Sequence, residues 1–337
     1  MLEKNTDTPG LYNSHMVIYI VAIIVVAIVI VVLAYSFSGK PQSTPVNNLV
    51  YVANSNGNSV SVINAYTYGV VNNIQVSNPR GIAVSSNGQY VYVTDYNTSS
   101  VSVISASTDK VIATIPLPPG SYPLGIALSP DNSKLYVADS GHNTISVIST
   151  ATDSVISTIT VGNAPYDVVL SPNGEYAYVS NSASNSISII TTNSGTVVST
   201  TPVRARPMGE AITSDGTKLY VVNNGNNSVS VIDTSTKQLI SNIGVGVSPM
   251  SIAAGTNGSS MYVTDYVENS VSIINTATNL MTITFKVGTN PYALNFASNG
   301  QLYVTNEADG TVSVVDTVDN TVINTIHVGS GPVAVSS

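Results

Sequence analysis

The feature that most constrains this chain of 337 residues is an internal repeat of about 42 residues. A Tyr-Val pair recurs at intervals of 41, 44, 42, 42, 42 and 41 residues. Its tyrosines are Tyr51, Tyr92, Tyr136, Tyr178, Tyr220, Tyr262 and Tyr303. A second motif, [ST]-[VI]-S-[VI]-[IV], keeps the same intervals and begins at Ser59, Ser100, Thr144, Ser186, Ser228, Ser270 and Thr311. Two motifs in step predict a repeat protein whose stacked units share one core.

Each repeat contains four short runs rich in β-branched residues, separated by turns of Asn, Asp, Gly and Ser. In the second repeat these runs are 81–85, 90–94, 101–105 and 111–117. Such runs predict strands, and the Asn-Gly or Asp-Gly pairs between the first two predict tight hairpins. Four antiparallel strands in about 42 residues are typical of one propeller blade.

The two ends of the repeat region predict how the ring closes. The first repeat, from Leu49, lacks its first strand, and the final segment 332–337 resembles that missing strand. We therefore predict an all-β, seven-bladed propeller of four-stranded antiparallel blades over residues 49–337. The C-terminal strand completes the first blade.

The N-terminal region contains an uncharged run of 22 residues, 16–37, and about 20 helical residues span a bilayer core. A cleaved signal peptide is the alternative. The run exceeds a usual signal core of about 7–15 residues, and the preceding segment is not basic, so an anchor is favoured. We predict a short cytoplasmic tail (1–15), a transmembrane helix (16–37), a linker (38–48) and the membrane as a partner.

The charge content limits the classes of partner and chemistry. Asp, Glu, Lys and Arg make up 8% of the chain, against roughly 25% in average proteins. A net charge of -8 with only ten Lys and Arg residues argues against nucleic-acid binding. Cysteine is absent, and His15, His142 and His327 share no motif, so no metal site, cofactor or catalytic triad is expected.

Three N-x-[ST] sequons, at Asn97, Asn226 and Asn257, are candidate glycosylation sites. They fit a propeller that lies outside the cytoplasm, on the far side of the cell membrane from the tail.

Tyr303–Asn306 spells YVTN, and the other repeats carry YVAN, YVTD, YVAD, YVSN and YVVN. In these motifs residues 49–337 resemble the YVTN β-propeller repeats common in archaeal surface and surface-layer-associated proteins. The resemblance implies that the strand after each repeat's proline lies innermost, beside the central axis. That family includes surface-layer proteins, binding modules and a few enzymes, so the resemblance is more specific for fold than for function.

Three polar residues break the pattern of the inner strands, where other repeats carry Gly, Ile and Ala: Asp167, Glu210 and Asn295. A buried charge is costly unless it is paired or reaches a channel. The first interpretation is that Glu210 pairs with Arg204 or Arg206, and that Asp167 lies at an exposed strand start.

The alternative interpretation is an axial pocket with Arg80 on one wall and Arg206 near the other, flanked by Tyr166 and Tyr292. The three arginines of the chain all fall in loops assigned to one face, and guanidinium binds carboxylate in a bidentate manner. The candidate ligand-binding residues are Arg80, Arg204, Arg206, Tyr166, Asp167, Glu210, Tyr292 and Asn295.

Two sets of recurring residues have structural interpretations. The repeated tyrosines invite a carbohydrate-stacking role, but recurrence at one strand position favours packing between blades. Asp95, Asp139 and Asp265 follow the Tyr-Val motif on one face, where a calcium site is one interpretation. Their regular placement favours capping of turns.

The leading functional hypothesis is a membrane-anchored extracytoplasmic propeller that serves the cell envelope as a binding module. Its ligand would be an envelope protein or glycan, in a surface layer or in adhesion. One alternative is an extracytoplasmic enzyme, a lyase or hydrolase with an axial pocket, and another is a structural spacer. An enzyme requires an axial cavity that holds an acid and a base with perturbed pKa values, whereas a binding module requires a broad outer face.

Overall fold

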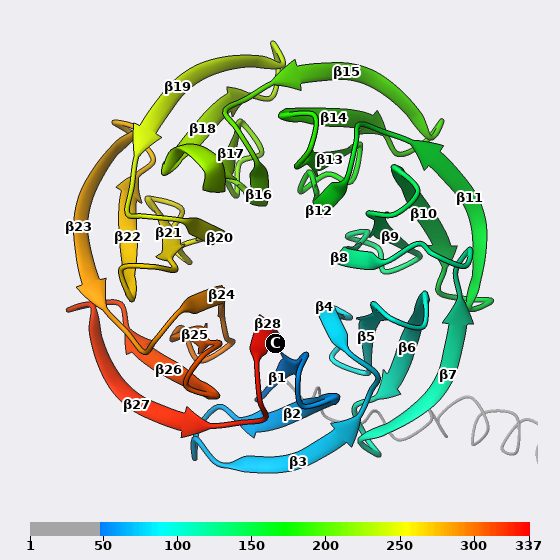
Figure 1. Ribbon diagram of the computed structural model, residues 1–337, viewed down its shortest axis with the longest axis vertical. Coiled ribbons are helices and arrows are strands. Elements are labelled where there is room, and N and C mark those ends of the chain that lie inside the picture. Colours follow the sequence, from blue (N-terminus) through cyan, green and yellow to red (C-terminus); the bar gives the residue numbers. More distant parts are fainter. Residues whose placement is uncertain (1–47) are drawn as a thin grey trace, which may run out of the picture. The chain divides into compact units, whose positions relative to one another are not determined.

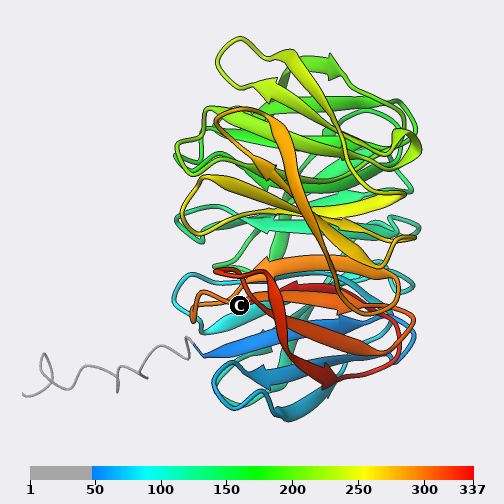
Figure 2. The same cartoon turned by 90° about the vertical axis from the view of Figure 1, so that its left-hand side faces the viewer.

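The computed structural model describes residues 48–337, which form a ring of seven four-stranded sheets around a central axis (Figure 1). The predicted tail, transmembrane helix and most of the linker lie outside the described residues. Within 48–337 the only helix is a single turn, η1 (Asn224–Asn226), and none is long and apolar enough to cross a bilayer. Seen edge-on, the ring is a disc whose strands cross its thickness (Figure 2).

Each blade contributes one strand to each of four concentric positions. The inner strands all begin at a proline: β28 (Pro332–Ser336), β4 (Pro79–Val84), β8 (Pro123–Leu128), β12 (Pro165–Leu170), β16 (Pro207–Ile212), β20 (Pro249–Ala254) and β24 (Pro291–Phe296). The second strands are β1 (Leu49–Asn54), β5 (Tyr90–Asp95), β9 (Lys134–Asp139), β13 (Tyr176–Asn181), β17 (Lys218–Asn223), β21 (Ser260–Asp265) and β25 (Leu302–Asn306). The third strands are β2 (Ser59–Asn64), β6 (Ser100–Ser105), β10 (Thr144–Ser149), β14 (Ser186–Thr191), β18 (Ser228–Asp233), β22 (Ser270–Asn275) and β26 (Thr311–Asp316). The outer strands are β3 (Val70–Gln75), β7 (Lys110–Pro116), β11 (Ser154–Thr160), β15 (Thr196–Pro202), β19 (Gln238–Gly244), β23 (Leu280–Lys286) and β27 (Thr321–His327).

The C-terminal strand closes the ring, as predicted. β28 pairs antiparallel with β1, and this pairing joins Val52 to Val335 and Ala53 to Ala334. The first blade is therefore β28-β1-β2-β3, and the second to seventh blades follow in chain order from β4 to β27. Closure leaves no blade without a neighbour on either side.

The hydrophobic core lies between blades. One cluster, for example, joins Val101 of β6 in the second blade to Leu135 of β9 in the third. The seven repeated tyrosines are 0–7% exposed, so the packing interpretation of these residues is confirmed. Because each blade buries its faces only against its neighbours, the repeat produces a continuous core around the ring.

The last residues of the second strands form a ring of buried side chains, here called the Asn/Asp ring: Asn54, Asp95, Asp139, Asn181, Asn223, Asp265 and Asn306. Each bonds to two hydroxyl groups of its own third strand. The Asn181 Nδ2, for example, donates to Ser188 Oγ at 3.0 Å, and Ser102 Oγ donates to Asp95 Oδ2 at 2.8 Å. The Ser/Thr positions of the second sequence motif therefore bond to the Nδ2 or Oδ2 atom of a buried side chain in every blade, while its Oδ1 has no hydrogen-bond partner.

The residue before each inner-strand proline has a positive φ, between 45° and 65°. In five blades its N–H donates to an Asn side chain that precedes a third strand, as Arg206 N does to Asn185 Oδ1 at 2.9 Å. This left-handed residue turns the chain from the rim toward the axis. It fixes which residues of the inner strand face the centre.

Candidate active site

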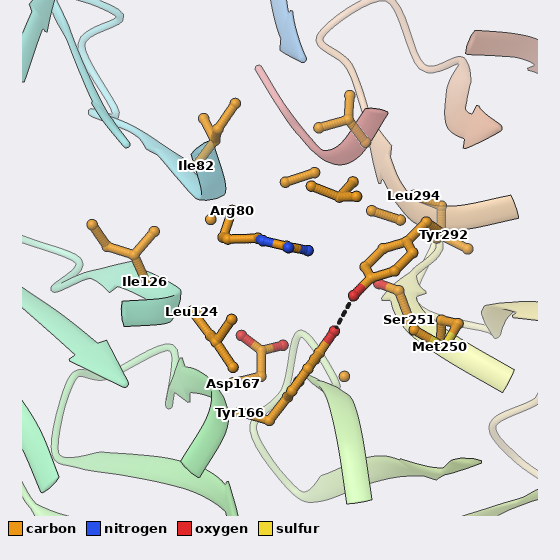
Figure 3. Close-up of a pocket in the computed structure, with 17 residues that line it drawn as sticks. Arg80, Ile82, Leu124, Ile126, Tyr166, Asp167, Met250, Ser251, Tyr292 and Leu294 are labelled. Carbon is orange, nitrogen blue, oxygen red and sulfur yellow. Dashed lines mark hydrogen bonds between the residues drawn. The ribbon is translucent and has the colours of Figure 1, made fainter. Parts of the chain in front are cut away.

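An axial cavity of about 170 Å³ lies among the seven inner strands (Figure 3). Every inner strand contributes its third residue to the lining, and six of these seven residues are Gly, Ala or Ser. The seventh is Asp167. An engineered cavity of about 150 Å³ admits benzene, so this space holds a molecule of about one small ring.

Among the residues that line this cavity, Arg80 is the single one with a positively charged side chain. It is the second residue of β4, so the prediction that it lies in a loop is wrong: Pro79 begins the strand one residue earlier. Its guanidinium carbon lies 5.3 Å from the centre of the Tyr96 ring, and its Nε is buried without a hydrogen-bond partner. The side chain points across the cavity toward Tyr292 (Figure 3). The arginine therefore presents unused donors to a ligand.

Asp167, the third residue of β12, faces the same cavity and is half-buried rather than at an exposed strand start. Burial raises the pKa of its carboxyl to about 6, while the backbone N–H groups of Val168 and Glu210 favour the ionised form. A Cβ atom at Gly125 would lie 2.4 Å from Asp167 Oδ1, so the glycine of β8 makes room for this carboxyl. Asp167 is thus a carboxylate at neutral pH that can still accept a proton.

No Lys or Arg within residues 48–337 forms an ion pair with Asp167. Arg80 and Asp167 therefore share one small cavity without neutralising each other in a direct contact. Both charges remain free to act on a molecule bound between them.

Two phenols meet across the axis. Tyr166 of β12 and Tyr292 of β24 are joined by a hydrogen bond of 2.6 Å between their hydroxyl groups (Figure 3). Burial raises the pKa of both, that of Tyr166 well above 10, and the Arg80 charge acts in the opposite direction on each. Both phenols are therefore neutral near pH 7; one O–H is donated within the pair, and the other is left to donate to a ligand.

The other sequence candidates lie outside the cavity lining. Arg204 and Arg206 are exposed in the loop before β16, although the Arg206 charge lowers the pKa of Tyr292 from outside the lining. Glu210 is 4% exposed and neither carboxyl oxygen has a hydrogen-bond partner, so its predicted pairing with Arg204 or Arg206 is wrong. Asn295 is half-buried and does not line the cavity.

Sequence reasoning missed Tyr96, which lies under the Arg80 guanidinium, and the lining residues Gly125 and Ser251. Alignment of the third residues of the inner strands identifies the last two positions. Nothing in the sequence marks Tyr96, because its contact depends on where the Arg80 side chain points.

Asp95, Asp139 and Asp265 of the Asn/Asp ring lie outside the axial cavity. Burial raises the pKa of each to about 6, and the hydroxyl groups bonded to each carboxyl oppose that rise. They bond to third-strand hydroxyls, as Ser272 Oγ does to Asp265 Oδ2 at 2.7 Å, rather than capping turns. No cluster of three His, Asp or Glu residues that could hold a metal ion occurs in the described part of the chain.

The sequons lie on exposed loop residues. Asn97, Asn226 and Asn257 are all exposed, and the Asn226 side chain accepts a hydrogen bond from Ala205 N at 2.7 Å. Their glycosylation stays a prediction.

Comparisons with known proteins support a propeller family. A family model described as "Lactonase, 7-bladed beta-propeller" matches residues 77–212. No curated protein matches the chain significantly. Hydrazine synthase of Kuenenia stuttgartiensis is similar in structure, with 22% identity and a TM-score of 0.74 over 81% of this chain and 94% of that one.

Two further solved structures carry enzyme names. Virginiamycin B lyase from Staphylococcus aureus has 22% identity and a TM-score of 0.65, over 74% of this chain and 84% of that one. A putative 6-phosphogluconolactonase from Bacteroides fragilis has 16% identity and a TM-score of 0.74, over 87% and 99%. At these identities the likeness establishes the fold alone.

The hypothesis of an envelope binding module is corrected by the family comparison. The matching family model is one of lactonases, which favours the enzyme alternative over the binding module. The matched segment 77–212 also contains Arg80, Tyr166 and Asp167 of the cavity.

Proposed function

We propose that the propeller is a hydrolase or lyase that opens a small cyclic ester in the axial cavity. The observation that carries the proposal is the pairing, in one cavity of about 170 Å³, of an unpaired guanidinium with a carboxylate that can accept a proton. The raised pKa of Asp167 and of Tyr166 in this cavity supports the enzyme interpretation. The lactonase family match supports a cyclic ester as the substrate class.

Asp167 acts as the general base in this proposal. In hydrolysis it removes a proton from water, the resulting hydroxide adds to the ester carbonyl, and the carboxylic acid returns the proton to the ring oxygen as it leaves. In elimination it removes a proton from the carbon next to the C–O bond, which then breaks to release a carboxylate. A base with a pKa near neutrality suits either reaction.

Arg80 binds the negative charge that develops on the substrate. In hydrolysis this is the oxyanion of the tetrahedral intermediate, and in elimination it is the departing carboxylate. Guanidinium donors in a cavity with little water stabilise such charge strongly. The Tyr166–Tyr292 phenol pair supplies one neutral O–H donor, because the other hydroxyl proton lies in the bond between the two phenols.

The direct test incubates the full chain with five- and six-membered lactones, each with and without a free carboxylate. Mass spectrometry distinguishes hydrolysis, which adds one water, from elimination, which adds none. Arg80→Leu should lower kcat/KM by about 10²-fold or more, as for other lost oxyanion donors. Arg204→Leu is the matched control, because it removes an exposed arginine outside the cavity. Absence of turnover across the panel, or equal effects of both variants, would contradict the proposal.

The location of the enzyme is a separate proposal. We infer from the uncharged segment 16–37 and the sequons that a membrane helix holds the propeller outside the cytoplasm. Protease added to intact cells should remove a propeller epitope and spare an N-terminal tag. The opposite pattern would reverse the orientation.

The narrower resemblance to YVTN-repeat surface proteins of archaea rests on the tetrapeptide 303–306 and its variants. It supports the same extracytoplasmic placement. A surface-labelling experiment on the native host tests it.

A further inference from the structure

Glu210 breaks the repeat at a position that faces a blade interface. It is the fourth residue of β16, and the fourth residues of the other inner strands are all aliphatic: Ile82, Ile126, Val168, Ile252, Leu294 and Val335. Six blades have Ile, Val or Leu at this position. The fifth blade has a carboxyl group there instead.

The burial of Glu210 is nearly complete and its polar atoms are unsatisfied. The residue is 4% exposed, and neither Oε1 nor Oε2 has a hydrogen-bond partner. The backbone N–H groups of Val169 and Ser180 favour its ionised form without reaching hydrogen-bond geometry. Such an orphaned buried group is rare in folded proteins and calls for an explanation.

The neighbour of Glu210 on the axial side is Asp167. The backbone N–H of Glu210 favours the Asp167 carboxylate, and the Asp167 charge in turn raises the pKa of Glu210, next in size after burial itself. The other ionisable group that Glu210 affects is Tyr178 of β13, and no arginine or lysine acts on it. Two carboxyl groups on adjacent inner strands are therefore coupled, one facing the cavity and one behind it.

Resting on the proposed function, we propose that Glu210 is a positioning residue that keeps its own proton and leaves Asp167 as the single ionised carboxyl of the axial site. When Asp167 accepts a proton from the substrate or from water, Glu210 does not exchange its own. The pair passes from one negative charge to none, and the substrate receives the electron pair of the bond that loses its proton.

The neutral Glu210 also supplies a polar group next to Asp167. Replacement by leucine leaves Asp167 in a more apolar setting, which disfavours the carboxylate. Glutamine keeps a neutral polar group of the same shape. The two variants therefore separate polarity from packing, because leucine suits this position in the other blades.

The test uses the full chain with Glu210→Gln, Glu210→Leu, Asp167→Asn and, as an exposed control, Glu175→Gln. Infrared difference spectra at neutral pH should contain a protonated carboxylic acid band in wild type and Glu175→Gln that is missing in Glu210→Gln. In Asp167→Asn this band should titrate at lower pH, because the opposing charge is gone. A spectrum of Glu210→Gln identical to wild type would overturn the proposal.

The pH profile of kcat/KM provides the second readout. Its acid limb should have a midpoint near the Asp167 pKa of about 6 in wild type and in Glu210→Gln. In Glu210→Leu the midpoint should move upward by about one pH unit, a loss of about tenfold at acid pH. An unmoved limb in Glu210→Leu would reduce Glu210 to a packing residue. If no substrate is turned over, the proposed function fails, while the infrared result still decides the protonation of Glu210.

Discussion

Aspartates in two different settings of the molecule have a raised pKa. The aspartates of the Asn/Asp ring and Asp167 of the axial cavity all have a pKa raised to about 6, and in each case burial is the main cause. They differ in their partners. Each ring aspartate accepts hydrogen bonds from two hydroxyls, as Asp95 does from Ser100 and Ser102, whereas no side-chain hydroxyl bonds to the Asp167 carboxyl.

A perturbed pKa therefore does not by itself mark a functional site. Positions of the Asn/Asp ring recur in all seven blades, and four blades use Asn, which cannot titrate. Asp167 occurs once and faces a cavity with Arg80. In a repeat protein, the departure from the repeat carries more information about function than the shift in pKa.

Asp167 and the ring aspartates should differ most in their contribution to catalysis. Asp167→Asn should lower kcat/KM by about 10²- to 10⁴-fold, because it removes the general base. Asp265→Asn, which replaces a carboxyl of similar pKa outside the cavity, should leave kcat/KM within about twofold of wild type. Steady-state kinetics of the two variants checks this. Equal losses of kcat/KM in the two variants would contradict the assignment of Asp167 as the general base.

The ring aspartates should also make the free energy of unfolding depend on pH. The ring aspartates have folded pKa values raised from 3.8 to about 6, so their contribution to stability is fully present below about pH 4 and is lost as pH rises through about 6. Each of these pKa shifts corresponds to a loss of at most about 3 kcal/mol of folding free energy near pH 7. Asp139→Asn should therefore raise the free energy of unfolding at pH 7 and change it little at pH 4.

Denaturant unfolding at the two pH values measures this effect. Asp131→Asn is the control, because the pKa of that exposed carboxyl is lowered to about 2 by bonds from Ser129 and Ser133. Its loss should slightly destabilise the fold at pH 7. If both variants have a higher free energy of unfolding at pH 7, the lower net negative charge, rather than the loss of a buried carboxyl, would explain the effect.

The third prediction concerns the glycines that pack on the Asn/Asp ring. A Cβ atom at Gly246 would lie 2.4 Å from Asp265 Cγ, whereas a Cβ at Gly244 meets nothing within 4 Å. Gly246→Ala should lower the free energy of unfolding by about 1–3 kcal/mol through overpacking. Gly244→Ala should stay within about 0.5 kcal/mol. Matching thermal unfolding curves for the two variants would mean that the loop around Gly246 moves to accept the methyl group without loss of stability.

The sequence predicts the blade number, the closure by β28 and the strand bounds of the second blade to within about two residues. These features depend on local turn chemistry and β-branched runs, which repeat in step. It also predicts an axial pocket with Arg80, Arg206, Tyr166 and Tyr292; the structure places Arg80, Tyr166 and Tyr292 in the cavity lining together with Asp167, and Arg206 outside it. Their role in ligand binding stays a prediction.

The direction of individual side chains was not predictable. The register shifts between Pro207 and Glu210, so simple alternation along β16 does not tell which residues face the axis. The cost of an unpaired buried charge favours a partner such as Arg204 or Arg206 for Glu210, whereas the structure places Glu210 at a blade interface without one. Arg80 was placed in a loop because the start of β4 depends on the left-handed residue Asn78 before Pro79.

The Tyr166–Tyr292 hydrogen bond joins two non-adjacent blades across the axis, and its loss should have a small effect on stability. The bonds of the Asn/Asp ring to third-strand hydroxyls stay within a blade, whereas the Tyr166–Tyr292 bond links the fourth blade to the seventh. Tyr292→Phe should cost about 1 kcal/mol of unfolding free energy, the usual net value of one hydrogen bond. Tyr66→Phe, at a tyrosine that is 63% exposed, should cost less than about 0.5 kcal/mol. Because neither phenol carries the proton in the proposed reaction, kcat/KM of Tyr292→Phe should fall far less than that of Asp167→Asn. A loss as large as that of Asp167→Asn would place the Tyr292 hydroxyl in the chemistry itself, beside Asp167 and Arg80.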